Sequence, residues 1–276
     1  MTTNERDLSG LSFLDLADGG RLAYRDTGSG PPLVLLHGGF LDHRMWHAQI
    51  PALAAGHRVL APDARGHGAS SNATGPFRQT DDVAELLRRL DTGPAVLIGL
   101  SMGAGIAVDT ALEHPDLVRA LVVTGAGTSE PDFQDPWSTA LLAEWTGALA
   151  AGDIEGWLEA TLRWVAGPHR TLDRIDPDVV RRLREMQLGT ITKHTADEPD
   201  WRVPVTDTWK RAAGIEVPVL AIHGGIDADD HLRMADRLVA TVRDGRAATV
   251  DGTAHYPNME RPEAYLTLLT GFLGTL

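Results

Sequence analysis

The sequence contains no cysteine, so disulfide bonds, thiolate metal sites and a cysteine nucleophile are all excluded. Lysine is nearly absent, since Lys193 and Lys210 are the only two, and arginine supplies the remaining positive charge. The 38 acidic residues outnumber the 25 basic ones, which gives a net charge of −13. No basic stripe interrupts this acidity, so we do not expect nucleic acid as a partner.

Long hydrophobic runs are missing as well. No apolar run approaches the roughly 20 residues that a membrane-spanning helix needs, and the polar residues 1–7 have no apolar signal core behind them. We therefore expect a soluble, cytoplasmic protein with no membrane partner. With 276 residues, 43% of them hydrophobic, the chain can bury one sizeable core with an inserted subdomain.

Short apolar runs alternate with helical patterns in both halves of the chain. The run Leu33–Leu36 is continuously apolar, as expected of a strand that is buried on both faces. Such alternation indicates βαβ units and an α/β fold with a mostly parallel, doubly wound sheet. Beside a hairpin around residues 17–20, we expect strands at 59–61, 96–98, 121–123, 217–222 and 247–250, and helices at 45–55, 80–90 (capped by Thr80), 102–114, 230–242 and from 262 onward.

The alternation breaks near Gly125. Residues 128–213 look helical throughout and hold six of the seven tryptophans. We expect this segment to be a helical cap inserted into an α/β core domain formed by residues 1–127 and 214–276. Its apolar stripes at helical spacing are Trp137, Leu141 and Trp145; Ile154, Trp157, Leu158 and Leu162; and Val179, Val180, Leu183 and Met186, which follow the helix start Asp176-Pro177.

The apolar run 96–98 leads into Gly99-Leu100-Ser101-Met102-Gly103, a Gly-x-Ser-x-Gly motif between a strand and a helix. In this nucleophile elbow the serine adopts a strained backbone conformation, so that its hydroxyl projects above the sheet. The two glycines lack the Cβ atoms that would collide where strand and helix cross. A Gly-rich turn that happens to hold a serine is the alternative, and the rest of the chain decides between the two.

A serine nucleophile needs a base, and the base needs an orienting acid. With this elbow the acid and the base follow the serine in the order Ser, Asp, His. Asp227 follows the strand that ends at Ile222, and His255 follows the strand that ends at Val250, so both can reach the carboxyl edge of the sheet. Asp229 and Asp230 are alternatives for the acid, although both precede a helix and are typical of N-cap residues.

The other histidines have ordinary structural explanations. His37 and His67 lie in loop motifs, where an imidazole usually holds backbone in place, and Asp63 and Arg65 are expected to brace the same region. His114 ends a helix, where a positive charge suits the macrodipole. His223 precedes the acid loop and could support the site from behind. The remaining six have no motif and are predicted to be surface or cap residues: His43, His47, His57, His169, His194 and His231.

Four motifs follow one another along the chain: His37-Gly38-Gly39-Phe40, Arg65-Gly66-His67-Gly68-Ala69-Ser70, Gly99-Leu100-Ser101-Met102-Gly103 and Gly252-Thr253-Ala254-His255. In this order they resemble the motifs of an α/β-hydrolase with a helical cap, in the broad group of esterases, lactonases, enol-lactone hydrolases and cofactor-free haloperoxidases. The resemblance covers essentially the whole chain and is least specific in the cap.

The resemblance implies a catalytic triad in which Ser101 is the nucleophile, His255 the base and Asp227 the orienting acid. It also implies an oxyanion hole made by the backbone N–H groups of Met102 and Gly39. No metal or cofactor is expected.

We therefore expect a small-molecule hydrolase that cleaves a carboxylic ester or lactone through an acyl-enzyme, acting as a monomer or homodimer. Phe40 and the cap tryptophans Trp137, Trp145 and Trp164 are candidate substrate contacts for a bulky hydrophobic or aromatic substrate, although packing alone explains most tryptophans. The same triad serves C–C bond hydrolysis, acyl transfer, perhydrolysis and lyase chemistry in this fold, so these reactions stay open. A ligand-binding module with little turnover is the remaining alternative.

Overall fold

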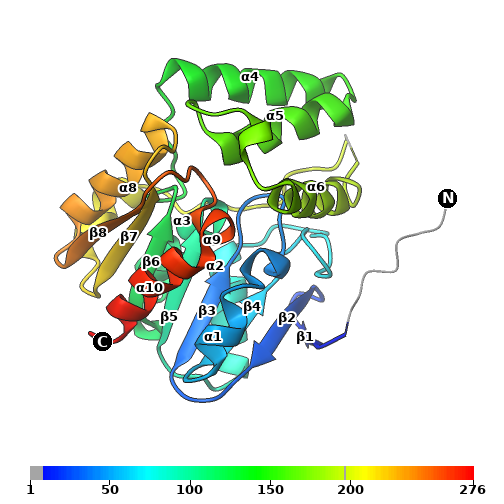
Figure 1. Cartoon of the computed structure of the whole chain (residues 1–276). Coiled ribbons are helices and arrows are strands. Elements are labelled where there is room, and N and C mark those ends of the chain that lie inside the picture. Colours follow the sequence, from blue (N-terminus) through cyan, green and yellow to red (C-terminus); the bar gives the residue numbers. More distant parts are fainter. Residues whose placement is uncertain (1–8, 196) are drawn as a thin grey trace.

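The computed structural model describes residues 9–195 and 197–276. Eight strands in this part of the chain form one sheet in the order β1-β2-β4-β3-β5-β6-β7-β8 (Figure 1). Pairs β1/β2 and β2/β4 are antiparallel, and every pair from β4/β3 to β7/β8 is parallel. The strands are β1 Leu11–Asp15, β2 Arg21–Thr27, β3 Pro32–Leu36, β4 Arg58–Pro62, β5 Ala95–Leu100, β6 Val118–Thr124, β7 Val219–Gly224 and β8 Gly245–Val250.

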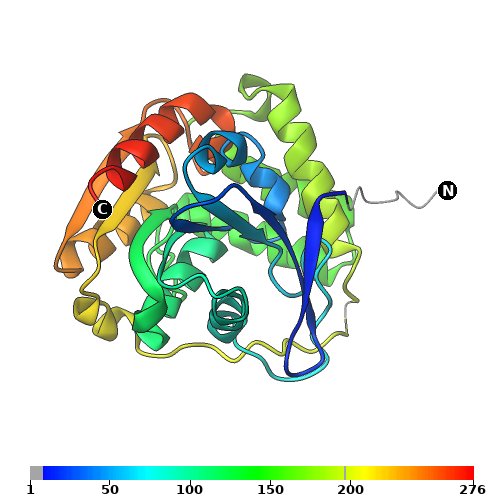
Figure 2. The ribbon, with the colours of Figure 1, turned by 90° about the horizontal axis from the view of Figure 1, so that it is seen from below.

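Helices cover both faces of this sheet, which is why every residue of β5 and β7 is buried. Helices α1 and α10 pack on one face, and α2, α3 and α8 pack on the other (Figure 2). The predicted α/β fold with a mostly parallel, doubly wound sheet is confirmed.

The 3₁₀ and α-helices of the described residues have the following bounds: η1 His43–Trp46, α1 Ile50–Ala54, α2 Gln79–Arg89, α3 Met102–Glu113, η2 Pro115–Leu117, α4 Pro136–Ala150, α5 Ile154–Ala166, η3 Leu172–Arg174, α6 Pro177–Ile191, α7 Thr208–Arg211, η4 Ala212–Gly214, α8 Asp229–Thr241, α9 Pro257–Glu260 and α10 Pro262–Leu273.

Helices α4, α5 and α6 lie above the carboxyl ends of the parallel strands (Figure 1). The chain leaves the sheet at Thr124, at the end of β6, and rejoins it at Val219 in β7. Helix α5 packs against both α4 and α6, and a small apolar cluster joins residues of all three helices to Phe40. Most other buried residues of α5 and α6 pack in the same core cluster as the strands. That these helices and the sheet are separate domains stays a prediction. None of the helices in the described ranges has the length and apolar composition that crossing a bilayer requires.

Four local expectations are wrong. Residues 128–213 are not helical throughout, because the described residues between the end of α6 at Ile191 and the start of α7 at Thr208 contain no helix. The helix predicted over 45–55 is two short pieces, η1 and α1, because Pro51 has no N–H with which to continue a helix from the preceding turn. Helix α2 begins at Gln79 after an extended Arg78, so Thr80 is buried in the first turn and does not cap it. Ile154 is 37% exposed at the first position of α5, outside the buried stripe to which it was assigned.

Candidate active site

Ser101 occupies the tight turn between β5 and α3. Its backbone has φ 54° and ψ −115°, a left-handed conformation that is strained for a residue with a Cβ atom. The glycines on either side make the turn possible. A Cβ on Gly99 would lie 2.2 Å from the carbonyl oxygen of Gly103, and one on Gly103 would lie 2.2 Å from the carbonyl oxygen of Leu36. The strand–turn–helix context that the elbow motif requires is therefore present.

The end of β6 connects this turn to the imidazole of His255. The Ser101 N–H donates to the carbonyl oxygen of Thr124 at 2.8 Å, and Gly125 follows with φ 63°. A Cβ on Gly125 would lie only 2.5 Å from Cε1 of His255. Glycine at this position lets the imidazole lie directly against the backbone beside Ser101.

Asp227 and His255 approach each other from the loops that follow β7 and β8. The distance from His255 Nδ1 to Asp227 Oδ2 is 3.0 Å, and both residues are buried. The second carboxylate oxygen, Oδ1, accepts the N–H of Ala228 at 2.8 Å. Of the three candidate acids, Asp227 is the one that contacts this imidazole. Asp229 is exposed in the first turn of α8, and Asp230 binds Arg233.

The charges of this pair follow from their surroundings. Burial opposes ionisation of Asp227, but the imidazoles of His231 and His255 outweigh it and hold the pKa of the carboxyl well below its usual range. Burial lowers the pKa of His255, and His231 lowers it further. Asp227 is therefore an acceptor only, His255 Nδ1 carries the proton that points to it, and Nε2 is left unprotonated as a base requires.

His231 is a neighbour of this pair that sequence reasoning missed. The prediction of a surface or cap position is wrong, because the residue is 5% exposed. Its Nδ1 lies 3.1 Å from Asp227 Oδ1, and its ring stacks on the His255 ring with centroids 4.0 Å apart and an interplanar angle of 24°. The spacing of four residues from Asp227 gave no signal, because Asp227 precedes the N-cap Ala228 and lies outside the helix.

The two backbone groups expected to form an oxyanion hole lie beside the Ser101 turn. Met102 is the first residue of α3, where backbone N–H groups have no acceptor within the helix. A Cβ on Gly39 would lie 3.9 Å from the Cβ of Met102, so the two segments are in contact distance. Phe40 follows with φ 59°, which turns the chain sharply after Gly39. The oxyanion role of Gly39 and Met102 stays a prediction.

Comparison with known proteins fits this geometry. A family model described as the alpha/beta hydrolase fold matches residues 31–262. The chain belongs to the α/β-hydrolase family. It is 34% identical, over 87% of its length and 96% of the relative's, to pimeloyl-[acyl-carrier protein] methyl ester esterase of Aromatoleum aromaticum.

Two solved structures extend the comparison. A hydrolase from Pseudomonas aeruginosa PA01 is 33% identical with a TM-score of 0.80, and the match covers 96% of this chain and 99% of that one. The enol-lactonase from Burkholderia xenovorans LB400 is 26% identical with a TM-score of 0.80, covering 95% and 100% of the two chains. The protein is thus an enzyme of the hydrolase class.

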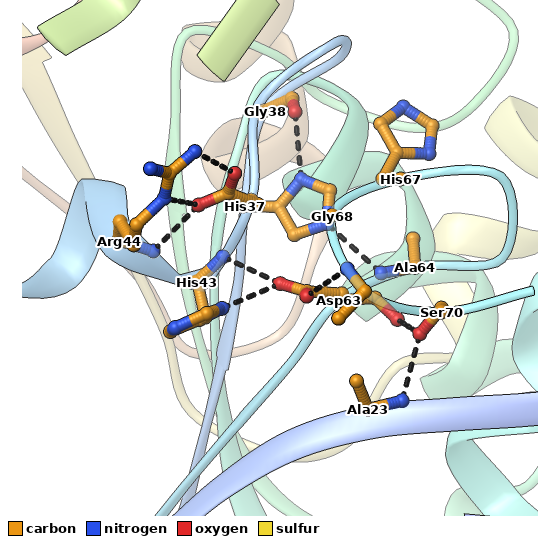
Figure 3. A network of polar contacts seen from close by, with 12 residues as sticks. Ala23, His37, Gly38, His43, Arg44, Asp63, Ala64, His67, Gly68 and Ser70 are labelled. Atoms are coloured by element: carbon orange, nitrogen blue, oxygen red, sulfur yellow. Dashed lines mark hydrogen bonds and ion pairs between the residues drawn. The ribbon is translucent and has the colours of Figure 1, made fainter. Parts of the chain in front are cut away.

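The buried carboxylate of Asp63 braces the loops that follow β3 and β4 (Figure 3). Asp63 accepts from Nδ1 and the backbone N–H of His43, at 2.7 and 2.8 Å, and from the N–H of Ala69 at 2.8 Å. His37 Nε2 accepts the N–H of Ala64 at 2.9 Å, so this imidazole holds backbone. His43, predicted to be a surface or cap residue, is instead part of the brace.

Arg65 adds a second brace to the loop that follows β4. Its guanidinium binds Asp82 of α2 and Asp18 of the β1–β2 turn, and it lies over the Phe77 ring at 4.5 Å. Burial raises the pKa of Asp82 to about 6, although Arg65 opposes the shift. The expected structural roles of Asp63 and Arg65 agree with these contacts.

Aromatic rings from the cap of the hydrolase reach the histidine pair. The ring of Trp164 in α5 lies 4.8 Å from His231 and 5.9 Å from His255. Trp137 packs edge-on against Trp164 at 5.0 Å. Trp145 and Trp157 both pack edge-on against Phe40, at 5.7 and 4.8 Å. Of the predicted substrate contacts, Trp164 is therefore the tryptophan that packs on His255, and all four assignments stay predictions.

Two groups of side chains among the described residues place ligand atoms within 4.8 Å of one another, as a metal site requires. They are Asp227, His231 and His255, and Asp42, His43 and Asp63. In both groups a carboxylate oxygen already pairs with an imidazole nitrogen. These contacts pair the carboxylate oxygens and imidazole nitrogens with one another. That the hydrolase needs no metal or cofactor stays a prediction.

Proposed function

We propose that the protein hydrolyses a carboxylic ester or lactone of a small molecule through an acyl-enzyme on Ser101. The observation that carries this proposal is the hydrogen bond between the buried side chains of His255 and Asp227. The His255 ring packs against Gly125, and the preceding residue, Thr124, accepts the Ser101 N–H. Nucleophile, base and acid thus come from three strand ends at one edge of the sheet. The esterase and enol-lactonase similarities support the same reaction class.

In the acylation step, the Ser101 hydroxyl attacks the substrate carbonyl while His255 Nε2 takes its proton. The negative charge of the tetrahedral intermediate moves to the carbonyl oxygen, where the N–H groups of Met102 and Gly39 stabilise it. The imidazolium of His255 is stabilised by Asp227 through its Nδ1–H. Collapse of the intermediate breaks the ester C–O bond, and His255 returns the proton to the leaving alkoxide.

In the deacylation step, a water molecule gives its proton to His255 Nε2 and attacks the acyl carbonyl. The second intermediate collapses to the carboxylic acid, and Ser101 regains its proton from His255. A lactone follows the same steps, except that the leaving alcohol remains attached to the acyl group. The pair Asp227–His255 therefore performs both proton transfers without an added group.

The cap supports a preference for bulky hydrophobic or aromatic substrates. Trp164 packs on His231 and His255, and Phe133 packs on Trp164 at 6.3 Å. Phe40, next to the proposed oxyanion donor Gly39, is flanked by further cap tryptophans. Apolar surroundings keep bulk water away from the acyl-enzyme, and they favour apolar substrate groups.

A fluorophosphonate probe tests the nucleophile. We expect mass spectrometry to place one label on Ser101, because only this hydroxyl lies at the elbow. Ser101→Ala should lose the label and lower turnover of p-nitrophenyl and naphthyl esters by several orders of magnitude, with a residual acceleration of roughly 10³-fold from the oxyanion hole and binding.

Ser129→Ala is the matched control, since Ser129 is exposed just beyond the end of β6. It should label and turn over like the parent enzyme. A label at Ser71 or Ser129, or full turnover by Ser101→Ala, would contradict the proposal.

A further inference from the structure

Asp227 interacts with more groups than the triad requires. Oδ2 faces His255 Nδ1, while Oδ1 accepts the N–H of Ala228 and also faces His231 Nδ1 at 3.1 Å. All three side chains are buried, with exposures of 2% for Asp227, 5% for His231 and 3% for His255. One ionised carboxylate is thus shared between two stacked imidazoles.

We propose that His231 is a positioning residue of the catalytic machinery: it holds the Asp227 carboxylate in register with His255 and limits how strongly that carboxylate stabilises the His255 imidazolium. This inference rests on the proposed serine hydrolase function and adds a fourth side chain to it. The position lies at the beginning of α8, on the turn that follows Asp227.

The hydrogen-bond geometry assigns the protons. An ionised carboxylate only accepts, so the nitrogen that each imidazole turns towards it carries hydrogen. His231 Nδ1–H and the Ala228 N–H then fix Oδ1 from two directions, which prevents rotation of the carboxylate about its Cβ–Cγ bond. Oδ2 is left aimed at His255 Nδ1, and the tautomer with a free Nε2 follows.

The stacking sets a limit on charge. Two positively charged imidazole rings with centroids 4.0 Å apart in a buried site would repel each other. The stacked ring of His231 therefore opposes the positive charge that His255 gains when it accepts the Ser101 proton. The pKa of His255 is lowered first by burial and then by His231, with Asp227 partly offsetting both.

The remaining neighbours of the two rings are neutral. Trp164 and Phe133 pack on His231 at 4.8 and 5.7 Å. Tyr256 packs edge-on against His255 at 5.1 Å, and burial raises the pKa of its phenol well above the usual range, so it stays protonated. The acid next along α8, Asp230, is neutralised by Arg233. Asp227 is thus the single charge that faces both imidazoles among the described contacts.

Two substitutions separate the hydrogen bond from the stacked ring. His231→Phe keeps an aromatic ring on His255 but removes the donor to Asp227. His231→Asn removes the ring but places an amide N–H close to the position of Nδ1. Kinetics on an ester substrate, thermal unfolding and NMR titration of the His255 imidazole would be measured for both variants and the parent.

We expect His231→Phe to lower kcat by about ten- to a hundredfold with little change in KM, because a hydrogen bond to a buried charged group is lost. His231→Asn should recover most of that loss. In both variants the acid limb of kcat/KM and the NMR pKa of His255 should move to higher pH, because a cause that lowers this pKa is gone.

The outcomes are decisive in either direction. An unchanged His255 titration in both variants would overturn the proposal, as would a kcat loss in His231→Phe that His231→Asn does not reduce. If His231→Phe fails to fold, His231→Asn and its titration still decide. The NMR titration needs no substrate, so a protein that hydrolyses no ester or lactone would refute the proposed function while leaving the test of His231 intact.

Discussion

At the scale of single residues, Asp227 connects the two histidines to the backbone. Its carboxylate accepts an N–H from the main chain and faces two imidazole nitrogens, and the residue is 2% exposed. A neutral amide in this position would have to turn its NH₂ group towards one of the imidazoles, and that imidazole would then present an unprotonated nitrogen. The charge of Asp227 therefore decides the tautomer of His255.

Asp227→Asn should lower kcat by on the order of 10⁴, because the base would be held in the wrong tautomer. Steady-state kinetics on a naphthyl ester checks this value. Asp229→Asn is the matched control, since Asp229 lies two residues away and is exposed at the first position of α8. If Asp229→Asn were the severe variant, the acid would have been assigned to the wrong residue.

The sequence predicts some of these residues and not others, for a physical reason. Ser101 and His255 are predictable because each lies after a strand within a short motif. Asp227 is predictable because it follows a strand end between them, in the order Ser, Asp, His. His231 belongs to no such motif. Its role depends on how the loop after β7 turns into α8, which brings residue i+4 back over the carboxylate, and only the folded loop shows that turn.

At the scale of elements, the cap helices were predictable from their stripes, but their anchoring was not. The N-cap residue of α8 is Ala228, so the expectation that Asp229 and Asp230 are N-cap residues is wrong. Asp230 instead accepts the N–H groups of Gln134 and Asp135 at 2.8 Å each, just before α4. It also binds Arg233 on its own helix. This carboxylate ties α8 to the start of the cap, a tertiary contact between residues almost 100 positions apart that periodicity does not encode.

Trp164→Ala tests whether α5 contributes to substrate binding. We expect KM for a naphthyl or other large aromatic ester to rise about tenfold, equivalent to losing roughly 1.4 kcal/mol of apolar contact. KM for an acetate ester of a small alcohol should change little. Trp137→Ala serves as the comparison, because Trp137 packs on Trp164 and should have a smaller effect.

Parallel kinetics on both ester classes are sufficient for this test. Equal changes in KM for large and small esters would assign Trp164 to packing of the cap alone. A change in kcat without a change in KM would instead indicate a disturbed His255, on which the ring also packs.

At the scale of the whole molecule, the alternation of strands and helices predicted the parallel sheet, while the order of the strands did not follow from it. β2 pairs with β4 and not with β3, which is the next strand in the sequence. The antiparallel hairpin of β1 and β2 therefore lies at the edge of the sheet, beside β4. Local patterns report which faces are buried. They carry no information on which neighbour a strand takes.

We expect the acid stability of the molecule to depend on histidines that stay neutral in the folded protein. Burial lowers the pKa of His67 to about 3, and His37 beside it is lowered in the same direction. Each binds a proton more readily in the unfolded chain, so stability falls as the pH drops below about 6.5. Asp82 and Asp109, whose pKa values burial raises to about 6, act in the opposite direction between pH 6 and 4.

His67→Gln should make the protein less sensitive to acid. The parent loses the contribution of His67 progressively from about pH 6.5 towards pH 3, since the unfolded imidazole takes up a proton that the folded one rejects. Urea midpoints at pH 7.5 and pH 4.5 should therefore lie closer together in the variant than in the parent. His169→Gln, at an exposed cap position, is the control and should keep the parental difference. The same fall in midpoint for parent and His67→Gln would show that the acid sensitivity comes from other buried groups, with His37 and His255 the next to test.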